Sequence, residues 1–425
     1  MRPNIVLILA DDLGYGDLGC FNGGLSQTPA LDALAREGVC LSQHYSASPV
    51  CAPARASLLT GRYPHRTGAI DTLEMRGLDR LALRETTIAE LLRRACYATG
   101  LIGKWHNGAL DARYHPNRRG FDEAVGFIER HAREPFFLYL AYSAPHFPFE
   151  ALEDDVRPFR ETGRFTHAVA TLYGMLRALD RGVARVLETL AREGLAENTL
   201  VLFSSDNGPQ FGGQGEACTD RFNCGYRGAK GLVYEGGIRL PMLLRWPAGL
   251  DARRELGALV HLTDWLPTLL HVAGAEPPRD LLLDGVDVIA LLQGERGRVP
   301  PTRFWQWNRY TPALECNAAM RDGDWKLVRP AIRECMQLAP EDLAMDVDAK
   351  LRPERYGDIA RGPEPVREAF RTPPAQLFDL AQDPFEREDR AAGEPERVAR
   401  MERALASWFE EVENERRMIA ESAVG

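Results

Sequence analysis

Short runs of apolar residues alternate with helix-like segments along most of the chain. Five of these runs are typical of buried strands, at residues 5–9, 99–103, 136–142, 200–204 and 242–245. Strands that alternate with helices are typical of a mostly parallel sheet that is covered by helices on both faces. We therefore predict an α/β fold with a mostly parallel central sheet.

Two helices between these strands have recognisable start signals. Thr28 and Pro29 begin one helix, with proline at the first helical position, and Gly38 follows its end. Thr87 and Glu90 have the spacing of a capping box, in which each side chain bonds the backbone of the other residue. The pattern therefore predicts one helix between Thr28 and Gly38 and another directly after Thr87.

The pattern changes near residue 300. Residues 303–307 and 325–328 predict strands, residues 339–374 predict an acidic, proline-rich loop, and residues 394–417 predict a charged amphipathic helix. We therefore expect a large α/β domain over residues 1–299 and a smaller C-terminal α+β domain, with an irregular insertion, over residues 300–425.

Polar side chains that could bind a ligand or take part in catalysis follow four of the predicted strands. In chain order they are Asp11 and Asp12, Lys104 and His106, His146, and Asp206 and Asn207. Because ligands of open α/β sheets bind at the carboxyl ends of the strands, we expect these side chains to meet at one edge. The oxygen donors among them favour a hard cation such as Ca²⁺ or Mg²⁺ over simple capping of loops.

The composition and net charge exclude several classes of protein and of binding partner. A chain of 425 residues that is 45% hydrophobic and 27% charged is typical of a globular protein, which excludes fibrous and disordered classes. The net charge of −9 offers no basic footprint, so we expect neither a nucleic acid nor a membrane as partner. The first predicted strand follows Met1 too closely for a signal peptide, so the sequence as written predicts a cytoplasmic protein, or a periplasmic or secreted one if the N-terminus has been trimmed.

Cysteine and lysine usage adds two further expectations. The eight cysteines include no C-x-x-C pair, and we interpret them as free thiols, with bridges of Cys218 to Cys224 or Cys316 to Cys335 as the alternative. The 52 basic residues comprise 48 arginines and only four lysines, at positions 104, 230, 326 and 350. Lysines retained in such an arginine-rich chain are candidates for tasks that a guanidinium cannot perform. We nevertheless expect Lys326 on an exposed strand position and Lys350 in a solvated loop.

The segment around Cys51 carries the most specific pattern. Pro53 suits the first position of a short helix and Gly61 suits its end, which places Cys51 at the mouth of the helix, where anions are favoured. The alternative is that Cys51 is a small buried hydrophobe. By composition alone the pattern C-x-P-x-R is expected only about 0.06 times in this chain, so we interpret it as functional.

Together these motifs resemble the formylglycine-dependent sulfatases of the alkaline phosphatase superfamily. The resemblance extends from Met1 to about Pro384 and rests on Asp11-Asp12, on Cys51 to Arg55 with Leu59 to Arg62, on Gly103 to His106, on Ala144 to His146, on Ser205 to Gly208, on Lys230-Gly231, on Glu235 to Pro241 and on Leu377 to Pro384. Two departures are Asn107, where the family commonly has leucine, and the short connection between residues 122 and 135.

The resemblance implies a mechanism. A formylglycine-generating enzyme would oxidise Cys51 to formylglycine, whose hydrate would attack sulfur and later expel sulfate by elimination from its second hydroxyl. The ligands of Ca²⁺, or of Mg²⁺, would be residue 51 together with Asp11, Asp12, Asp206 and Asn207. The remaining roles would fall to Arg55 and His106, which orient the hydrate, to Lys104 and Lys230, which hold sulfate, and to His146, which protonates the leaving oxygen.

The implied activity is hydrolysis of a sulfate monoester, either a sulfated sugar or an aryl sulfate, to the alcohol and inorganic sulfate. A phosphonate monoester or phosphodiester hydrolase on the same fold is one alternative, and a non-catalytic sulfate-sugar binding protein with unmodified Cys51 is another. The aromatic cluster of Phe304, Trp305 and Trp307 with Arg309 and Tyr310 predicts either a stacking platform for a sugar or one packed face of a strand. The sequence leaves the oligomeric state open.

Overall fold

A computed structural model of the protein describes residues 2–108, 110–122, 127–212, 218–295, 297 and 299–422. Its large sheet has eight strands, in the order β3 (Ala98–Gly103), β4 (Phe136–Ala141), β1 (Asn4–Ala10), β5 (Thr199–Ser205), β6 (Arg239–Arg245), β2 (Val39–Tyr45) and β7 (Arg254–Leu256), with β8 (Val260–His261) also pairing with β2. The pairs among β3, β4, β1 and β5 are parallel, whereas β6 is antiparallel to both of its neighbours. The mostly parallel sheet is therefore confirmed.

All five predicted strands are present, as β1, β3, β4, β5 and β6. Three strands of the large sheet were not predicted, nor were two of the second sheet, at residues 318–322 and 376–379. In β2 buried and half-buried side chains are mixed, and its register shifts between Leu41 and His44, so the sequence shows no continuous apolar run there. The strands β7 and β8 have only three and two residues, which is too short for a pattern to be recognised.

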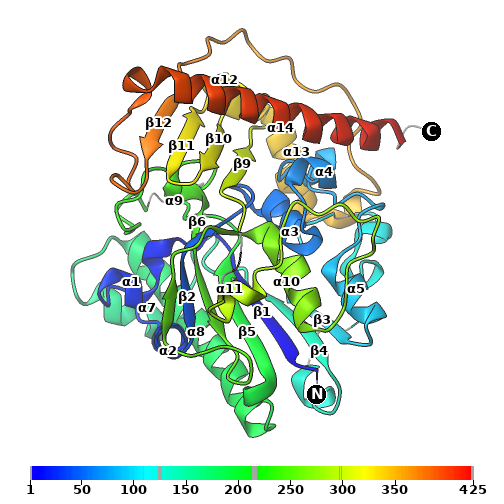
Figure 1. Ribbon diagram of the computed structural model, residues 1–425, viewed down its shortest axis with the longest axis vertical. Coiled ribbons are helices and arrows are strands. Elements are labelled where there is room, and N and C mark those ends of the chain that lie inside the picture. The colour runs from blue at the N-terminus through cyan, green and yellow to red at the C-terminus, as the bar shows by residue number, and fades with distance from the viewer. Residues whose placement is uncertain are drawn as a thin grey trace.

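Helices cover both faces of the large sheet (Figure 1). Side chains of β1 alternate between the two layers, with Leu7 in one core and Val6 in the other. The first core is completed by α3 (Cys51–Thr60), α5 (Ile88–Arg94), α10 (Trp265–Val272) and α11 (Ile289–Leu292), and the second by α2 (Pro29–Glu37), α6 (Phe127–Arg130), α7 (Glu153–Arg160) and α8 (His167–Arg192). Both predicted helix starts are confirmed, and Thr87 and Glu90 form the expected capping box.

A second, antiparallel sheet lies beside the first and has the order β12 (Gln376–Asp379), β11 (Trp325–Arg329), β10 (Ala318–Asp322) and β9 (Thr302–Gln306). The C-terminal helix α14 (Pro395–Ser422), red in Figure 1, crosses this sheet and buries Trp408 against Phe304, with ring centroids 5.1 Å apart. The neighbouring Trp305 packs on the other face, toward Tyr45 of the large sheet. The prediction of one packed aromatic face is therefore wrong, because consecutive strand residues point to opposite faces.

Two further expectations about the C-terminal part are wrong. Residues 340–351 form helix α13 (Pro340–Leu351) instead of a loop, with proline at its start, acidic residues in its first turn and Lys350 in its last. Lys326 is fully buried instead of exposed, because Glu235 and Glu386 neutralise it inside the protein.

The remaining helices are short: α1 (Gly19–Asn22), α4 (Pro64–Thr67), α9 (Glu235–Ile238) and α12 (Arg333–Met336). Among the described residues, no helix combines the length and the apolar character that crossing a lipid bilayer requires. All eight cysteines are free thiols, as expected, including Cys218, Cys224, Cys316 and Cys335.

Candidate active site

One edge of the large sheet collects the predicted site residues. The carboxyl ends of β1, β3, β4 and β5 lead to Asp11 and Asp12, to Lys104 and His106, to His146, and to Asp206 and Asn207. Strand β2 ends at the same edge and leads to Cys51, while the antiparallel β6 starts there, after the turn that carries Lys230. The topology therefore explains why these nine residues, from six segments of the chain, lie at one edge of the sheet.

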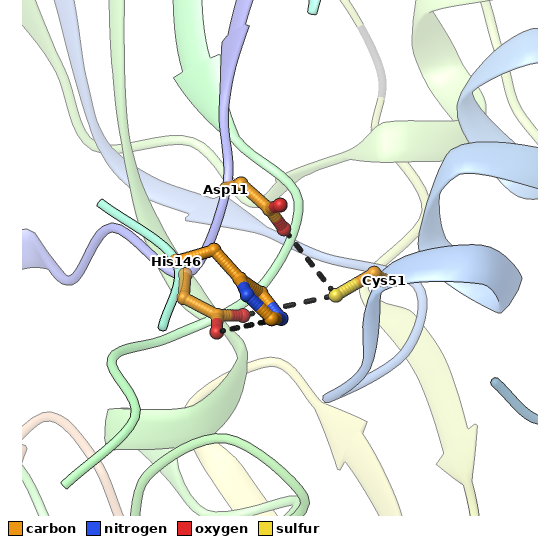
Figure 2. A group of neighbouring side chains, drawn as sticks. Asp11, Cys51 and His146 are labelled. Atoms are coloured by element: carbon orange, nitrogen blue, oxygen red, sulfur yellow. Dashed lines mark hydrogen bonds and ion pairs between the residues drawn. The ribbon is translucent and has the colours of Figure 1, made fainter. Parts of the chain in front are cut away.

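Cys51 is the first residue of α3 and is buried. Val50 is the N-cap, so the helix begins two residues earlier than the position of Pro53 suggested. The Sγ atom of Cys51 lies 3.4 Å from Oδ1 of Asp11 and 3.7 Å from Oδ1 of Asp12. Figure 2 shows Asp11, Cys51 and His146 pointing toward one another.

Burial raises the pKa of the Cys51 thiol well above its usual value, although Lys104 and Lys230 act in the opposite direction. An unmodified Cys51 is therefore protonated at neutral pH. Since the thiolate is the nucleophilic form of cysteine, this thiol is poorly suited to direct attack.

Three buried carboxylates surround Cys51, and each has a cation. Nζ of Lys104 lies 2.8 Å from Asp11, and Nζ of Lys230 lies 2.7 Å from Asp12. Arg55 donates from Nε to Oδ2 of Asp206 at 2.9 Å. Burial raises the pKa of Asp11, but Lys104 and Arg55 outweigh this effect and hold it well below its usual range.

The second and third carboxylates differ in their balance of charges. Burial also raises the pKa of Asp12, but Lys230 outweighs this effect and lowers it. For Asp206, burial prevails over Arg55 and raises the pKa to about 6. Three adjacent carboxylates that are removed from water favour an additional positive charge at this position.

The donor set fits a hard cation. Ligand atoms of Asp11, Asp12, Cys51 and His146 all lie within 4.8 Å of one another. Asn207 donates from Nδ2 to Oδ1 of Asp12 at 2.8 Å, while its buried Oδ1 atom has no hydrogen-bond partner. Buried polar atoms are rarely left unpaired, so this oxygen is available as a ligand. The oxygens of Asp11, Asp12 and Asn207 suit Ca²⁺ or Mg²⁺, whereas Cys51 and His146 add softer donors to the group. The predicted ligand Asp206 is not among the four residues of this group, and His146, which is, was not predicted as a ligand.

The two predicted histidines differ in their surroundings. His146 is half-buried, with Nε2 3.6 Å from Oδ2 of Asp12, and burial lowers its pKa although Asp12 opposes the effect. The side chain of His106 is 8% exposed, its Nε2 lies 3.6 Å from Oε1 of Glu74, and its backbone is left-handed (φ 53°). Such a conformation is costly for a residue with a side chain and is common at functional sites.

The family departure at Asn107 has a structural explanation. Its Nδ2 atom donates to the carbonyl oxygen of Ala52 at 3.0 Å, next to Cys51. An amide at this position therefore ties the loop after β3 to the first turn of α3.

Asp79 holds the same loop and provides a pH-dependent prediction. Its Oδ2 atom accepts the Gly108 N–H at 3.0 Å, its Oδ1 atom is buried without a partner, and burial raises its pKa to about 7. Because this pKa lies above that of the unfolded chain, ionisation favours unfolding as the pH rises from about 4 to about 7. Asp79→Asn keeps the acceptor and should increase the free energy of unfolding by about 1–3 kcal/mol at pH 8. Urea titrations should show that this gain shrinks toward pH 4, and a gain independent of pH would contradict the explanation.

A cavity of about 570 Å³ opens above Cys51. Its walls include His106, His146 and Lys230, together with residues that the sequence did not single out for a site: Thr72, Gln210, Phe211, Met336 and Lys350. Trp307 and Arg309 of the predicted aromatic cluster also line it, whereas Tyr310 is buried and bonds Asp342. These residues come from the loops after the strands and from the C-terminal part of the chain, where spacing along the sequence reveals no common site.

Comparison with known proteins decides the family. Residues 3–132 and 114–275 match the sulfatase family, and residues 227–344 match the C-terminal region of N-sulphoglucosamine sulphohydrolase. The chain is 30% identical to mouse steryl-sulfatase over 91% of its own length and 78% of that protein. The protein belongs to the sulfatase family.

Other relatives agree with this assignment. Canine N-acetylgalactosamine-6-sulfatase is 33% identical over 69% of this chain and 66% of its own. Among solved structures, Ps i-CgsB superimposes with a TM-score of 0.78 at 28% identity, over 96% of this chain and 93% of that one. The phosphonate monoester hydrolase of Agrobacterium radiobacter shares the fold, with a TM-score of 0.66 at 19% identity over 98% and 96% of the two chains. This sulfatase is accordingly a sulfuric ester hydrolase with an alkaline phosphatase-like fold.

Proposed function

We propose that this sulfatase hydrolyses a sulfate monoester of a saccharide, with residue 51 converted to formylglycine and a bound Ca²⁺ or Mg²⁺. The observation that carries the proposal is the position of Cys51: it is buried at the start of α3, within hydrogen-bond reach of Asp11 and Asp12. A buried, protonated thiol has little use there as a nucleophile, whereas a formylglycine hydrate offers a hydroxyl at the same place.

Two observations support a saccharide substrate. Ps i-CgsB has also been solved in complex with k-i-k-neocarrahexaose, a carbohydrate. In this chain, the cavity above Cys51 has the size of a small-molecule site and combines the Trp307 ring with polar groups. The phosphonate hydrolase alternative has only the shared fold in its favour.

Each residue of the site has a proposed task. Lys104 and Lys230 are point charges beside Cys51 and would hold sulfate oxygens. His146 lines the cavity and would donate a proton to the leaving alcohol oxygen. Arg55 and His106 would orient the residue at position 51, Arg55 through its bonds to Asp206.

The cation would be held by Asp11, Asp12, Asp206, Asn207 and residue 51. When bound, it would polarise sulfate oxygens and lower the pKa of the attacking hydroxyl. We further propose that residues 1–299 carry the chemistry, while residues 300–425 supply one wall of the cavity through Trp307, Arg309, Met336 and Lys350.

Removal of the cation should be measurable in two ways. Treatment with a chelator should lower kcat/KM for a sulfate ester at least about 100-fold, and Ca²⁺ or Mg²⁺ should restore it. The same cation should raise the unfolding temperature of the chelated protein, because it binds only the folded state. Asp12→Asn should abolish this thermal shift, whereas Asp111→Asn, at the N-cap of a short 3-10 helix outside the site, should retain it. Full activity in the chelator would contradict the cation's role.

A pair of substrates tests the proposed reaction. Protein produced together with a formylglycine-generating enzyme should hydrolyse 4-nitrophenyl sulfate with a kcat/KM well above that for a phenyl phosphonate monoester. The opposite preference would favour the phosphonate hydrolase alternative. If neither ester nor any saccharide sulfate is hydrolysed while the protein binds sulfated sugars, the non-catalytic alternative would be correct.

A further inference from the structure

We propose that Arg309 and Lys350 form a second anion-binding subsite, so that the preferred substrate is a saccharide sulfate ester carrying an additional negative group. This inference rests on the proposed function, because it assigns the sulfate ester to the end of the cavity at Cys51. The second group would be a carboxylate or another sulfate, and both have the charge and the oxygen acceptors that these side chains bind.

The charge of the cavity wall supports this assignment. Its lining includes Lys230, Arg309 and Lys350, but no aspartate or glutamate among the described residues. Lys230 is used at the sulfate end, where it pairs with Asp12. Arg309 and Lys350 are paired with acids that do not line the cavity: Arg309 with Asp71, and Lys350 with Asp346 and, at 4.0 Å, with Glu74. The wall itself thus presents cationic donors without an acidic acceptor, which suits an anionic ligand.

Arg309 has donors to spare. Its Nη1 atom donates to Oδ1 of the buried Asp71 at 2.7 Å and to Oγ1 of Thr72 at 3.0 Å. Within the described part of the chain, Nε and Nη2 have no recorded acceptor, and the side chain is 21% exposed. The guanidinium is thus fixed from behind while one edge of its fork stays available to a carboxylate or sulfate.

Lys350 is positioned by the docking of α13. Asp346 and Asp342 lie one and two turns before it on the same helical face. Nε of Arg76 donates to Oδ1 of Asp342 at 2.9 Å, and the Met75 N–H donates to Asp346 at 3.2 Å. Both acids thus hold α13 against the short 3-10 helix of residues 74–76. Lys350 donates to Asp346 at 2.8 Å and is 46% exposed at the cavity. Two of its three ammonium protons remain for a ligand.

Trp307 connects the two ends of the cavity. Its ring carries Arg309 at 4.9 Å from the centroid. On the other side the ring lies against Gly231, where an added Cβ would be 3.4 Å from it, directly after Lys230. Trp307 is only 4% exposed, so its ring acts as a spacer in the wall between Lys230, next to Gly231, and Arg309.

The test compares pairs of substrates on matched variants. The substrates are the monosulfate of a neutral hexose, the same hexose with a second sulfate, and the monosulfate of a hexuronic acid. The variants are Lys350→Gln and, as a control, Arg352→Gln, which removes an equivalent helical ion pair, to Asp348, outside the cavity lining. We expect the protein without substitutions to prefer the doubly charged esters. The preference is the ratio of kcat/KM for a doubly charged ester to kcat/KM for the hexose monosulfate, and Lys350→Gln should lower it about 10-fold or more.

Each outcome has a distinct meaning. Loss of the preference for only the disulfate or only the uronate identifies the second group as sulfate or carboxylate, and both results support the subsite. Two results overturn the subsite and leave the proposed function intact. One is turnover of the hexose monosulfate with no preference for the doubly charged esters. The other is an equal loss of kcat/KM on all three esters in Lys350→Gln. Failure to hydrolyse any sulfate ester, 4-nitrophenyl sulfate included, overturns both. If Lys350→Gln lowers the unfolding temperature, Lys350→Arg should restore stability and preference together.

Discussion

Cys51→Ala is expected to lower kcat/KM for a sulfate ester by about 10⁴-fold or more, because it removes the group from which the nucleophile is made. The fold should survive, since alanine fits the buried space of cysteine at the start of α3, while the cation site loses one of its five proposed ligands. The measurement is initial rates with 4-nitrophenyl sulfate, together with the unfolding temperature of each variant.

The matched control is Cys316→Ala, which deletes an equally buried thiol from the cluster that contains Ile332 and Cys335. It should keep kcat/KM within about two-fold, since it lies outside the cavity lining. A Cys51→Ala protein that still hydrolyses the ester at more than a few per cent of the original rate would show that residue 51 is not the nucleophile.

Lys326→Met is expected to cost about 3–5 kcal/mol of folding free energy, the largest stability effect that we predict. Nζ of Lys326 lies 2.9 Å from a carboxylate oxygen of Glu235 and 2.9 Å from one of Glu386, and all three side chains are fully buried. Removal of the ammonium leaves two adjacent carboxylates in the interior. The ion pairs also connect β11 to α9, so the loss should destabilise the contact between the two sheets.

The pH dependence of this effect can be derived from the two carboxyl groups. Burial raises the pKa of Glu386 to about 7, whereas Lys326 outweighs burial at Glu235 and lowers its pKa to about 2. Without Lys326, both groups resist ionisation in the folded state, and stability falls as the pH rises above the carboxyl pKa of the unfolded chain, about 4.3. Urea titrations should therefore show a smaller cost for Lys326→Met at pH 5 than at pH 8.

A second substitution separates charge from packing. In the Lys326→Met background, Glu235 keeps Arg239 at 3.6 Å, whereas Glu386 has lost the cation beside it. Glu386→Gln removes that charge and should recover part of the lost stability. If Glu386→Gln makes the variant worse at pH 8, the cost arises from packing and our electrostatic explanation is wrong.

The sequence predicted those parts of the fold that depend on local patterns. Continuous apolar runs identified the five central strands, and paired signals such as Thr87 with Glu90 identified helix starts. Strand β2 was missed because its buried and half-buried side chains are mixed around a bulge. The antiparallel direction of β6 depends on how distant strands pair, which no local pattern contains.

The site was predictable to the extent that its residues follow strands. The placement of Asp11, Asp206 and His146 could be expected from the rule that ligands bind at the carboxyl ends of parallel strands. Lys326 was misjudged because its two partners, Glu235 and Glu386, are 91 and 60 positions away in the sequence. Lys350 was misjudged for a similar reason, since its position at the cavity depends on the docking of α13 against residues 74–76.

The mass of the proteolytic peptide that carries Cys51 tests the central claim most directly. The protein should be produced in its native host, or together with an active formylglycine-generating enzyme, and digested without reduction or alkylation. We predict the mass of an aldehyde, or of its hydrate, at position 51, and the thiol mass at the buried Cys316 in the same digest. An unmodified thiol at position 51, in cells where the maturation enzyme demonstrably converts another sulfatase, would contradict the proposed nucleophile.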